Sequence, residues 1–228
     1  MKLFLKFVLS LWGAAAIAAA EPLNQEKRTV DHFECIEVHG SGTLFLKQGT
    51  STSLTVKAMT SDLPKITTAV HNNCLIIGPK KEASLNGPAE YFVVVDRLKK
   101  LKAFGNVTIN TQNTFKEQHF VLSLSGSSRA NMKLQNESFE GKISGNSEIF
   151  LQGKSQKQWL EINGHGMIDA KKFTTEKTTV STYGHSLVTV KALQELDANI
   201  NGAGIVKYYG NPKIHQKISG NGEIIPVE

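Results

Sequence analysis

Two histidines occupy equivalent places in a repeated corner of this 228-residue chain. His165 and His185 each follow the leading glycine of a Gly-His-Gly or Gly-His-Ser phrase. If the corners stack in register, the two imidazoles lie one strand spacing apart, and neutral histidine is a common metal ligand. A firm zinc site, however, needs three or four ligands. The neighbouring corner positions hold Asn146, Ala203 and Asn221. The pattern therefore favours a polar ladder over a metal site and predicts no cofactor.

Paired carboxylates offer a second kind of chemistry, because they can cleave a glycosidic bond across a gap of about 5 to 9.5 Å. Glu148 and Glu223 share one position of the repeat but lie four repeats apart, which is about 19 Å at the usual strand spacing. The Gly-x-Ser corners are not nucleophile elbows, since no helix follows them. The sequence thus supplies no catalytic residues and predicts a protein that is not an enzyme. A polysaccharide-active enzyme stays as an alternative.

Two cysteines and a tyrosine complete the candidate residues. Cys35 and Cys74 are the only cysteines, and both fall outside the alternating apolar pattern of their segments. An exported protein can form disulfides, so the sequence leaves open a Cys35–Cys74 bridge or two unpaired thiols. Tyr208 shares a position with buried aliphatic residues, which directs its neighbour Tyr209 outward. Tyr209 is the candidate for ligand contact, and an exposed tyrosine closing the edge of a repeat is the alternative.

The corners belong to a phrase that returns six times between Leu122 and Ile225. The phrase places a glycine after a short polar step and repeats every 18 to 20 residues. Such a period is too short for a propeller blade and lacks the helical half of a leucine-rich repeat. The leading glycines are Gly126, Gly145, Gly164, Gly184, Gly202 and Gly220.

Apolar residues keep fixed places around each leading glycine. They lie two positions before it and four and six positions after it, the alternation of a strand with one buried face. Strands at a constant period predict a parallel solenoid, in which each turn stacks on the previous one at about 4.8 Å. An antiparallel sandwich or barrel is the alternative. The column two positions before the glycine contains Leu124, Ile143, Ile162, Thr182, Ile200 and Ile218.

The N-terminal residues 1–20 have the form of a secretory signal peptide. Lys2 and Lys6 precede an apolar run, and three alanines end at Ala20. No later segment approaches the 20 or so apolar residues of a membrane span. Removing the two lysines lowers the formal charge from +6 to +4, and the basic clusters lack the interleaved aromatic residues of a single-strand binder. We therefore expect a protein exported to the periplasm or the cell surface, without a nucleic-acid partner.

The segment before the repeats is less regular. Residues 21–32 are polar and predict a flexible lead-in, and a strand pattern starts at Phe33 with Gly40 in the place of a leading glycine. Asn72 and Asn73 predict the turn of a hairpin between Ile66 and Ile77. No linker separates this segment from the repeats, so residues 33–228 are predicted to form a single domain.

The ordered combination of these phrases resembles one bacterial family, the GIN-type head domain of putative auto-transporter adhesins. The resemblance is carried by residues 200–212, where a Gly-x-Gly corner precedes a strand and a Tyr-x-Gly-x-Pro phrase, and by the final Ile-Ser-Gly-Asn-Gly of residues 218–222. Residues 33–46 and 93–98 also look like the family. Several corners here are Gly-x-Ser where the family has Gly-x-Gly. The resemblance implies a right-handed β-helix-like fold and a setting in the cell envelope, and it provides no catalytic residues.

Together these observations predict an all-β exported protein that presents a repeated strand face to a protein or polysaccharide at the cell envelope. A long strand surface suits a polymer or another protein better than a small molecule. A periplasmic structural or accessory protein is a further alternative. The oligomeric state cannot be deduced from the sequence.

Overall fold

The computed structural model describes residues 21–228, and the predicted signal peptide, residues 1–20, lies outside them. Strands and a short 3-10 turn (η1, Leu63–Lys65) form the regular structure of the described part, where no helix is long and apolar enough to cross a bilayer. The strands are β1 (Leu23–Arg28), β2 (Cys35–Gln48), β3 (Ser53–Met59), β4 (Ile66–His71), β5 (Cys74–Pro79), β6 (Glu90–Val95), β7 (Lys100–Thr111), β8 (Phe115–Gly126), β9 (Arg129–Gly145), β10 (Glu148–Gly164), β11 (Met167–Gly184), β12 (Leu187–Gly202), β13 (Ile205–Tyr209), β14 (Lys213–Ser219) and β15 (Glu223–Pro226).

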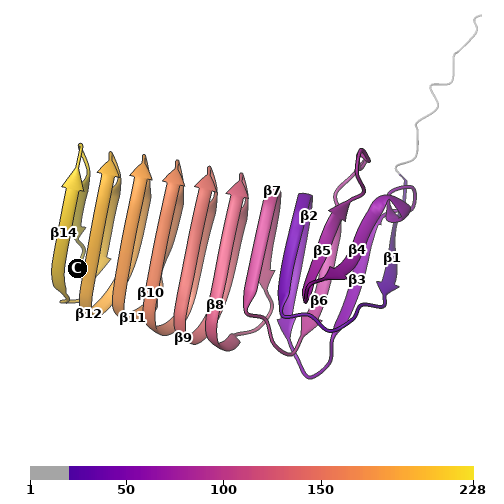
Figure 1. Cartoon of the computed structure of the whole chain (residues 1–228), viewed down its shortest axis with the longest axis horizontal. Coiled ribbons are helices and arrows are strands. Elements are labelled where there is room, and N and C mark those ends of the chain that lie inside the picture. The colour runs from indigo at the N-terminus through magenta and orange to yellow at the C-terminus, as the bar shows by residue number, and fades with distance from the viewer. Residues whose placement is uncertain (1–20) are drawn as a thin grey trace, which may run out of the picture.

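Parallel strands are stacked along the long axis of the molecule (Figure 1). From β8 to β12 each strand pairs in parallel with the next, and each of β9 to β12 forms about one turn; β13, β14 and β15 continue the stack. The chain makes about seven turns. The predicted parallel solenoid is confirmed, and the antiparallel alternative is wrong for the repeats.

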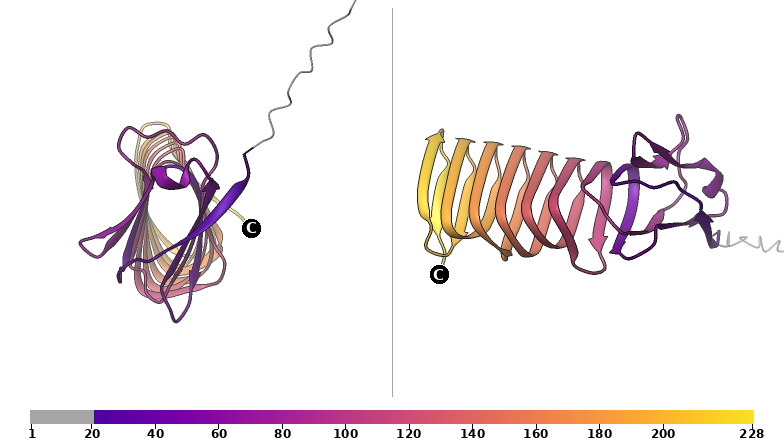
Figure 2. Two further views of the ribbon diagram at one scale, coloured as in Figure 1. Left: turned by 90° about the vertical axis from the view of Figure 1, so that its right-hand side faces the viewer. Right: turned by 60° about the horizontal axis from the view of Figure 1, so that its bottom comes forward.

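Each turn is a flattened ring with two corners, which Figure 2 shows in the view along the long axis. One corner carries the leading glycine and separates successive strands. The second corner lies inside the long strands, as at Gly153 in β10, whose φ is 115°. We call these the glycine corner and the far corner.

The predicted apolar columns line the inside of the ring. Ile143, Ile162, Thr182 and Ile200 are paired in register on successive strands and are at most 2% exposed. Stacking such columns buries a continuous core that a single turn could not bury. The last turn departs from the pattern, because no further turn covers it in the described chain, and Ile218 is 40% exposed.

Serine takes the inward place at three glycine corners, as Ser128, Ser147 and Ser186, and at the first two its hydroxyl bonds to the backbone of the preceding turn. The backbone N–H of Ser128 donates to Oγ of Ser147 at 3.0 Å, and that hydroxyl donates to the carbonyl oxygen of Gly126 at 3.2 Å. Ser128 repeats the arrangement one turn earlier, accepting from Val107 and donating to Gly105. These two corners therefore satisfy buried backbone groups through a side chain, whereas the hydroxyl of Ser186 has no hydrogen-bond partner in the described chain.

Antiparallel strands of the N-terminal part close the N-terminal end of the solenoid. β3 pairs with β6, and β4 and β5 form the predicted hairpin around Asn72 and Asn73, both at positive φ. Gly40 pairs in register with Gly105, as its predicted place in the repeat requires. Residues 21–32 differ from the predicted lead-in, because they contain β1, which pairs antiparallel with β3. Backbone pairing holds β1 there, since nearly all its side chains are exposed and leave no apolar pattern.

Candidate functional site

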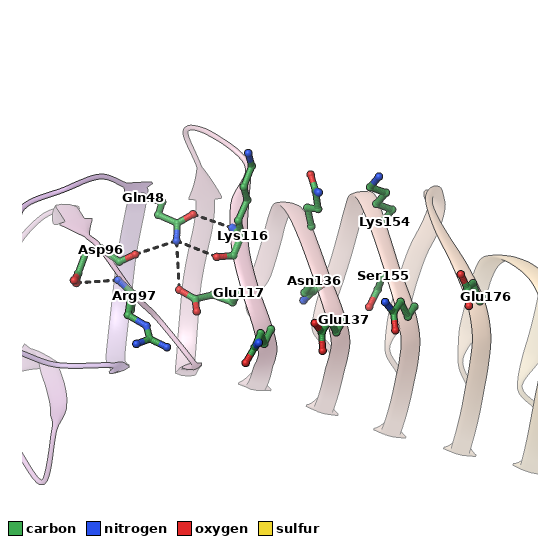
Figure 3. A pocket seen from close by; sticks show the side chains of 13 residues that line it. Gln48, Asp96, Arg97, Lys116, Glu117, Asn136, Glu137, Lys154, Ser155 and Glu176 are labelled. Atoms are coloured by element: carbon green, nitrogen blue, oxygen red, sulfur yellow. Dashed lines mark hydrogen bonds between the residues drawn. The ribbon is translucent and has the colours of Figure 1, made fainter.

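A polar groove of about 740 Å³ follows the far corner across successive turns. Figure 3 shows its side chains in rows on neighbouring strands, from Gln48 at one end to Glu176 at the other. Its walls mix acidic, basic and amide groups; among them are Arg97, Glu137 and Lys154. The constant strand spacing sets these side chains out at intervals of about 4.8 Å. An extended polar chain can therefore meet several of them at once.

Hydrogen bonds around Gln48 fix one end of the groove. Its Nε2 donates to the backbone oxygen of Asp96 at 3.0 Å and to Oε1 of Glu117 at 3.3 Å, while its Oε1 accepts from the N–H of Lys116 at 2.8 Å. Oε1 of Glu117 also accepts from the backbone N–H of Leu98 at 2.9 Å. These bonds hold Glu117 as a structural acceptor at the end of the groove.

Along the groove from Arg97 to Glu176 lie charged groups without an ion-pair partner in the described chain. Arg97, Glu137, Lys154 and Glu176 are exposed and take part in none of the ion pairs within residues 21–228. Beside them, both amide atoms of Asn136 are covered and have no hydrogen-bond partner in the described part of the chain. Buried amides are normally satisfied by protein, water or ligand. The groove thus offers charged and polar groups to a partner.

Around the far corner, the outer face of the same strands carries a half-open pocket of about 560 Å³ that is lined in part by Trp159. We call it the Trp159 pocket. The indole ring is 46% exposed, and Nζ of Lys142 lies 5.4 Å from its centroid. Lys142 also pairs with Glu140 at 2.7 Å, which raises the pKa of that lysine. On the other side, Lys177 pairs with Glu195 at 2.8 Å, and this bond lowers the pKa of the carboxyl.

The structure brings the two predicted histidines together. The rings of His165 and His185 are stacked with centroids 5.2 Å apart and planes 1° apart, at exposed glycine corners. The predicted register of this pair is confirmed, and metal binding by it stays a prediction. Within residues 21–228, neither histidine belongs to a group of three metal-ligating side chains.

Two other groups within residues 21–228 could offer three ligand atoms to a metal. Glu195, Asp197 and His215 lie on the outer face of β12 and β14, where Lys177 already binds Glu195. In the other group, with Glu37, both sulfurs belong to a Cys35–Cys74 disulfide and are not thiolate ligands.

The disulfide joins neighbouring strands of the N-terminal part. Cys35 on β2 and Cys74 on β5 are paired in register with Cα atoms 4.3 Å apart. Of the two arrangements that the sequence left open, the structure has the bridge. Tyr209 is partly buried on β13, in register with Lys191, and lines neither the groove nor the Trp159 pocket. Its ligand contact stays a prediction.

Reasoning from the sequence missed the groove, since it followed the corner marked by glycine. A weaker signal was present midway between the glycines. Polar triplets recur there once per turn, in residues 116–118, 135–137 and 154–156.

Comparison with known proteins gives one family and one fold. A family profile described as "Putative auto-transporter adhesin, head GIN domain" matches residues 32–212. No curated protein matches the chain.

Solved structures of Bacteroides and Parabacteroides proteins share the fold. A putative adhesin from Bacteroides fragilis superposes with a TM-score of 0.86 at 21% identity, covering 91% of this chain and 98% of its own. A putative adhesin from Parabacteroides merdae gives 0.75 at 21% identity, covering 90% and 96%. A putative lipid binding protein from Parabacteroides distasonis gives 0.74 at 20% identity, covering 90% and 97%. The profile spans most of the sequence, so this chain belongs to this head GIN domain family.

Proposed function

We propose that the protein is an exported binding protein of the cell envelope, adhesin-like and without catalysis, and that its partner is a polysaccharide or a protein that lies along the far corner. The observation that carries the proposal is the polar groove, which crosses several turns of one rigid stack. The family description of an adhesin head supports the setting. The signal-peptide pattern of residues 1–20 supports export.

The shape of the groove favours a long partner. Solenoids bind with extended surfaces because each turn adds a similar segment to the face. The free charges along the groove have both signs, which suits a mixed or neutral polymer better than a uniformly charged one. Glu117, held by Gln48 and the N–H of Leu98, is already engaged as an acceptor, and this supports binding over acid–base catalysis.

The proposal is tested by removing the free charges of the groove. We expect the triple variant Glu137→Ala, Lys154→Ala, Glu176→Ala of residues 21–228 to lose binding to its partner in a screen of glycans, matrix proteins and whole cells. The matched control is the double variant His165→Ala, His185→Ala, which removes two exposed side chains at the opposite corner. Equal binding by both variants would exclude the groove as the site.

A second measurement tests the location. Protease added to intact cells should digest the protein, or fractionation should find it released, if it meets a partner at the surface. Full protection in the periplasm would remove surface adhesion and leave a structural or accessory role there.

A further inference from the structure

We propose that the Trp159 pocket is a subsite for an uncharged sugar ring, with the indole as the stacking platform. The inference rests on the proposed binding function and names the chemistry of one part of the partner. It makes the partner a glycan with neutral pyranose units.

Three adjacent strands give the pocket one tall wall and a low floor. Trp159 on β10 is in register with Thr179 on β11, which in turn is in register with Asp197 on β12. Threonine and aspartate are both much shorter than tryptophan, so they form the floor beside the indole. The floor extends over two strand spacings, roughly 10 Å. A single six-membered ring fits on a floor of this width.

The exposed indole is the feature that most needs a partner. A tryptophan buries a large apolar area when it finds one, and here Trp159 remains 46% exposed in the lining of a pocket. A pyranose ring has one face of C–H groups and a rim of hydroxyl groups. The C–H face can lie on the indole while the rim donates to carboxylates such as Asp197 and Glu195, both of which line the pocket.

The charges of the pocket select against charged ligands. Two lysines line the pocket: Lys177 is paired with Glu195, and Lys157 is exposed and takes part in none of the ion pairs of the described residues. Lys142, beside the indole, is paired with Glu140. Asp197 adds a negative charge that balances Lys157, so the pocket has no excess of either sign. Nucleic acid also stacks on aromatic side chains, but its binding needs a positively charged groove for the phosphates. A neutral sugar meets neither repulsion nor an unpaired buried charge.

The pocket continues from the groove along the same strands. Glu137 in the groove precedes Ser138 in the pocket, and Gln156 and Lys157 are likewise divided between the two, as are Glu176 and Lys177. A polymer in the groove can therefore place one of its units on Trp159 without leaving the surface of β9, β10 and β11. This continuity favours an oligosaccharide over an isolated monosaccharide.

Tryptophan fluorescence gives a direct test, because the chain has two tryptophans and the other, Trp12, lies in the predicted signal peptide. In residues 21–228, all indole emission comes from Trp159. We expect neutral gluco-, galacto- or manno-configured oligosaccharides to change this emission saturably and to protect it from acrylamide quenching. A wild-type emission that no neutral oligosaccharide changes would overturn the inference.

Variants measured by calorimetry or on a glycan array complete the test. Trp159→Ala should bind at least about tenfold more weakly, as expected for a central tryptophan, and Trp159→Phe should fall between it and wild type. The control Tyr183→Ala removes another aromatic side chain, 48% exposed, that is not part of the pocket, and should bind like wild type. Unchanged thermal melting of the Trp159 variants shows that the fold is intact.

The outcomes separate this inference from the proposed function. If Trp159→Ala binds like wild type while the groove triple variant does not, the sugar subsite is wrong and the binding function stands. The neutral-sugar assignment is also overturned if Trp159→Ala weakens binding only to a protein or only to a charged polymer. If wild type binds nothing in the screen, both proposals fall.

Discussion

Gly145 lies against Gly126 of the preceding turn so closely that a Cβ atom on Gly145 would be 2.7 Å from the carbonyl oxygen of Gly126. The same carbonyl accepts the backbone N–H of Asn146 at 2.8 Å. Gly145 also has a φ of 106°, which side chains resist. Glycine is thus required in this column for two reasons: the backbone has a positive φ, and the preceding turn leaves no room for a Cβ atom.

Replacing Gly145 by alanine should lower the free energy of unfolding by more than about 2 kcal/mol, since strain of the left-handed backbone adds to the clash. Chemical denaturation measures the loss. Asn146→Ala, which changes the exposed neighbour in the same corner, is the control and should cost little. Equal stability of the two variants would contradict the close approach of the turns.

The inward column can be tested at Ile162, which is fully buried. Ile162→Asp should prevent folding of the repeats, because it buries a charge without a partner. Ile162→Val keeps the apolar contact and should cost only about 0.5–1.5 kcal/mol. Circular dichroism and thermal melting distinguish the two variants. Normal melting of Ile162→Asp would show that the side chain does not point inward.

The burial of Tyr91 should make the free energy of unfolding fall at high pH. Its ring is fully buried, its hydroxyl has no hydrogen-bond partner in the described chain, and burial raises its pKa to about 12. Because the pKa is raised in the folded state, the contribution of Tyr91 to stability is fully present below the unfolded pKa of about 10. That contribution is lost as the pH rises toward 12. Tyr91→Phe should match or exceed wild-type stability at pH 7 and weaken this alkaline loss. A marked destabilisation at pH 7 would reveal a hydroxyl partner.

Protonation of Asp62 should lower the stability of the protein in acid. This buried carboxylate binds Lys65 at 2.8 Å and accepts the backbone N–H groups of Asn86 and Gly87 at 2.7 and 3.1 Å. The bond to Lys65, followed by the two backbone bonds, lowers its pKa. Its stabilisation is therefore present above the unfolded pKa of about 3.9 and is lost as the pH falls below that value. Asp62→Asn should melt at a lower temperature at pH 7 and approach wild type in acid. A melting difference independent of pH would contradict this role.

The Cys35–Cys74 bridge closes a loop of 39 residues of the chain. The loop-entropy relation gives a stabilisation of about 4 kcal/mol for such a loop. Cys35→Ser with Cys74→Ser should therefore unfold at lower denaturant concentration, and reduction of the wild type should reproduce the shift. If reduction left the stability of the wild type unchanged while the double variant was destabilised, the loss would not come from the bridge.

The repeats could be predicted from the sequence because both of their constraints act on residue type. A glycine corner admits little besides glycine, and the inward column of Ile143 and Ile162 admits apolar side chains. Strand β1 could not be predicted in this way, since its pairing with β3 uses backbone groups that every residue has.

The candidate site was predictable only in part. The stacked pair His165 and His185 follows directly from the register of the corners. The groove depends on Gln48, which lies 68 residues before its hydrogen-bond partner Lys116, and no local pattern announces that contact. The exposed Trp159 was visible as an aromatic residue, but its neighbours Thr179 and Asp197 became known only when the turns were placed in register.

The inner columns repeat from turn to turn, whereas the outer columns do not. Around Trp159 the successive turns present the carboxylate of Glu140, the indole, the hydroxyl of Thr179 and the carboxylate of Asp197 at one position of the ring, so neighbouring turns differ in chemistry. A ligand displaced by a single turn would therefore meet a different surface, although the backbone beneath it is nearly unchanged. The repeated interior keeps the turns evenly spaced, and the varied exterior makes each turn chemically distinct. A long polymer can therefore bind in one defined register along the solenoid.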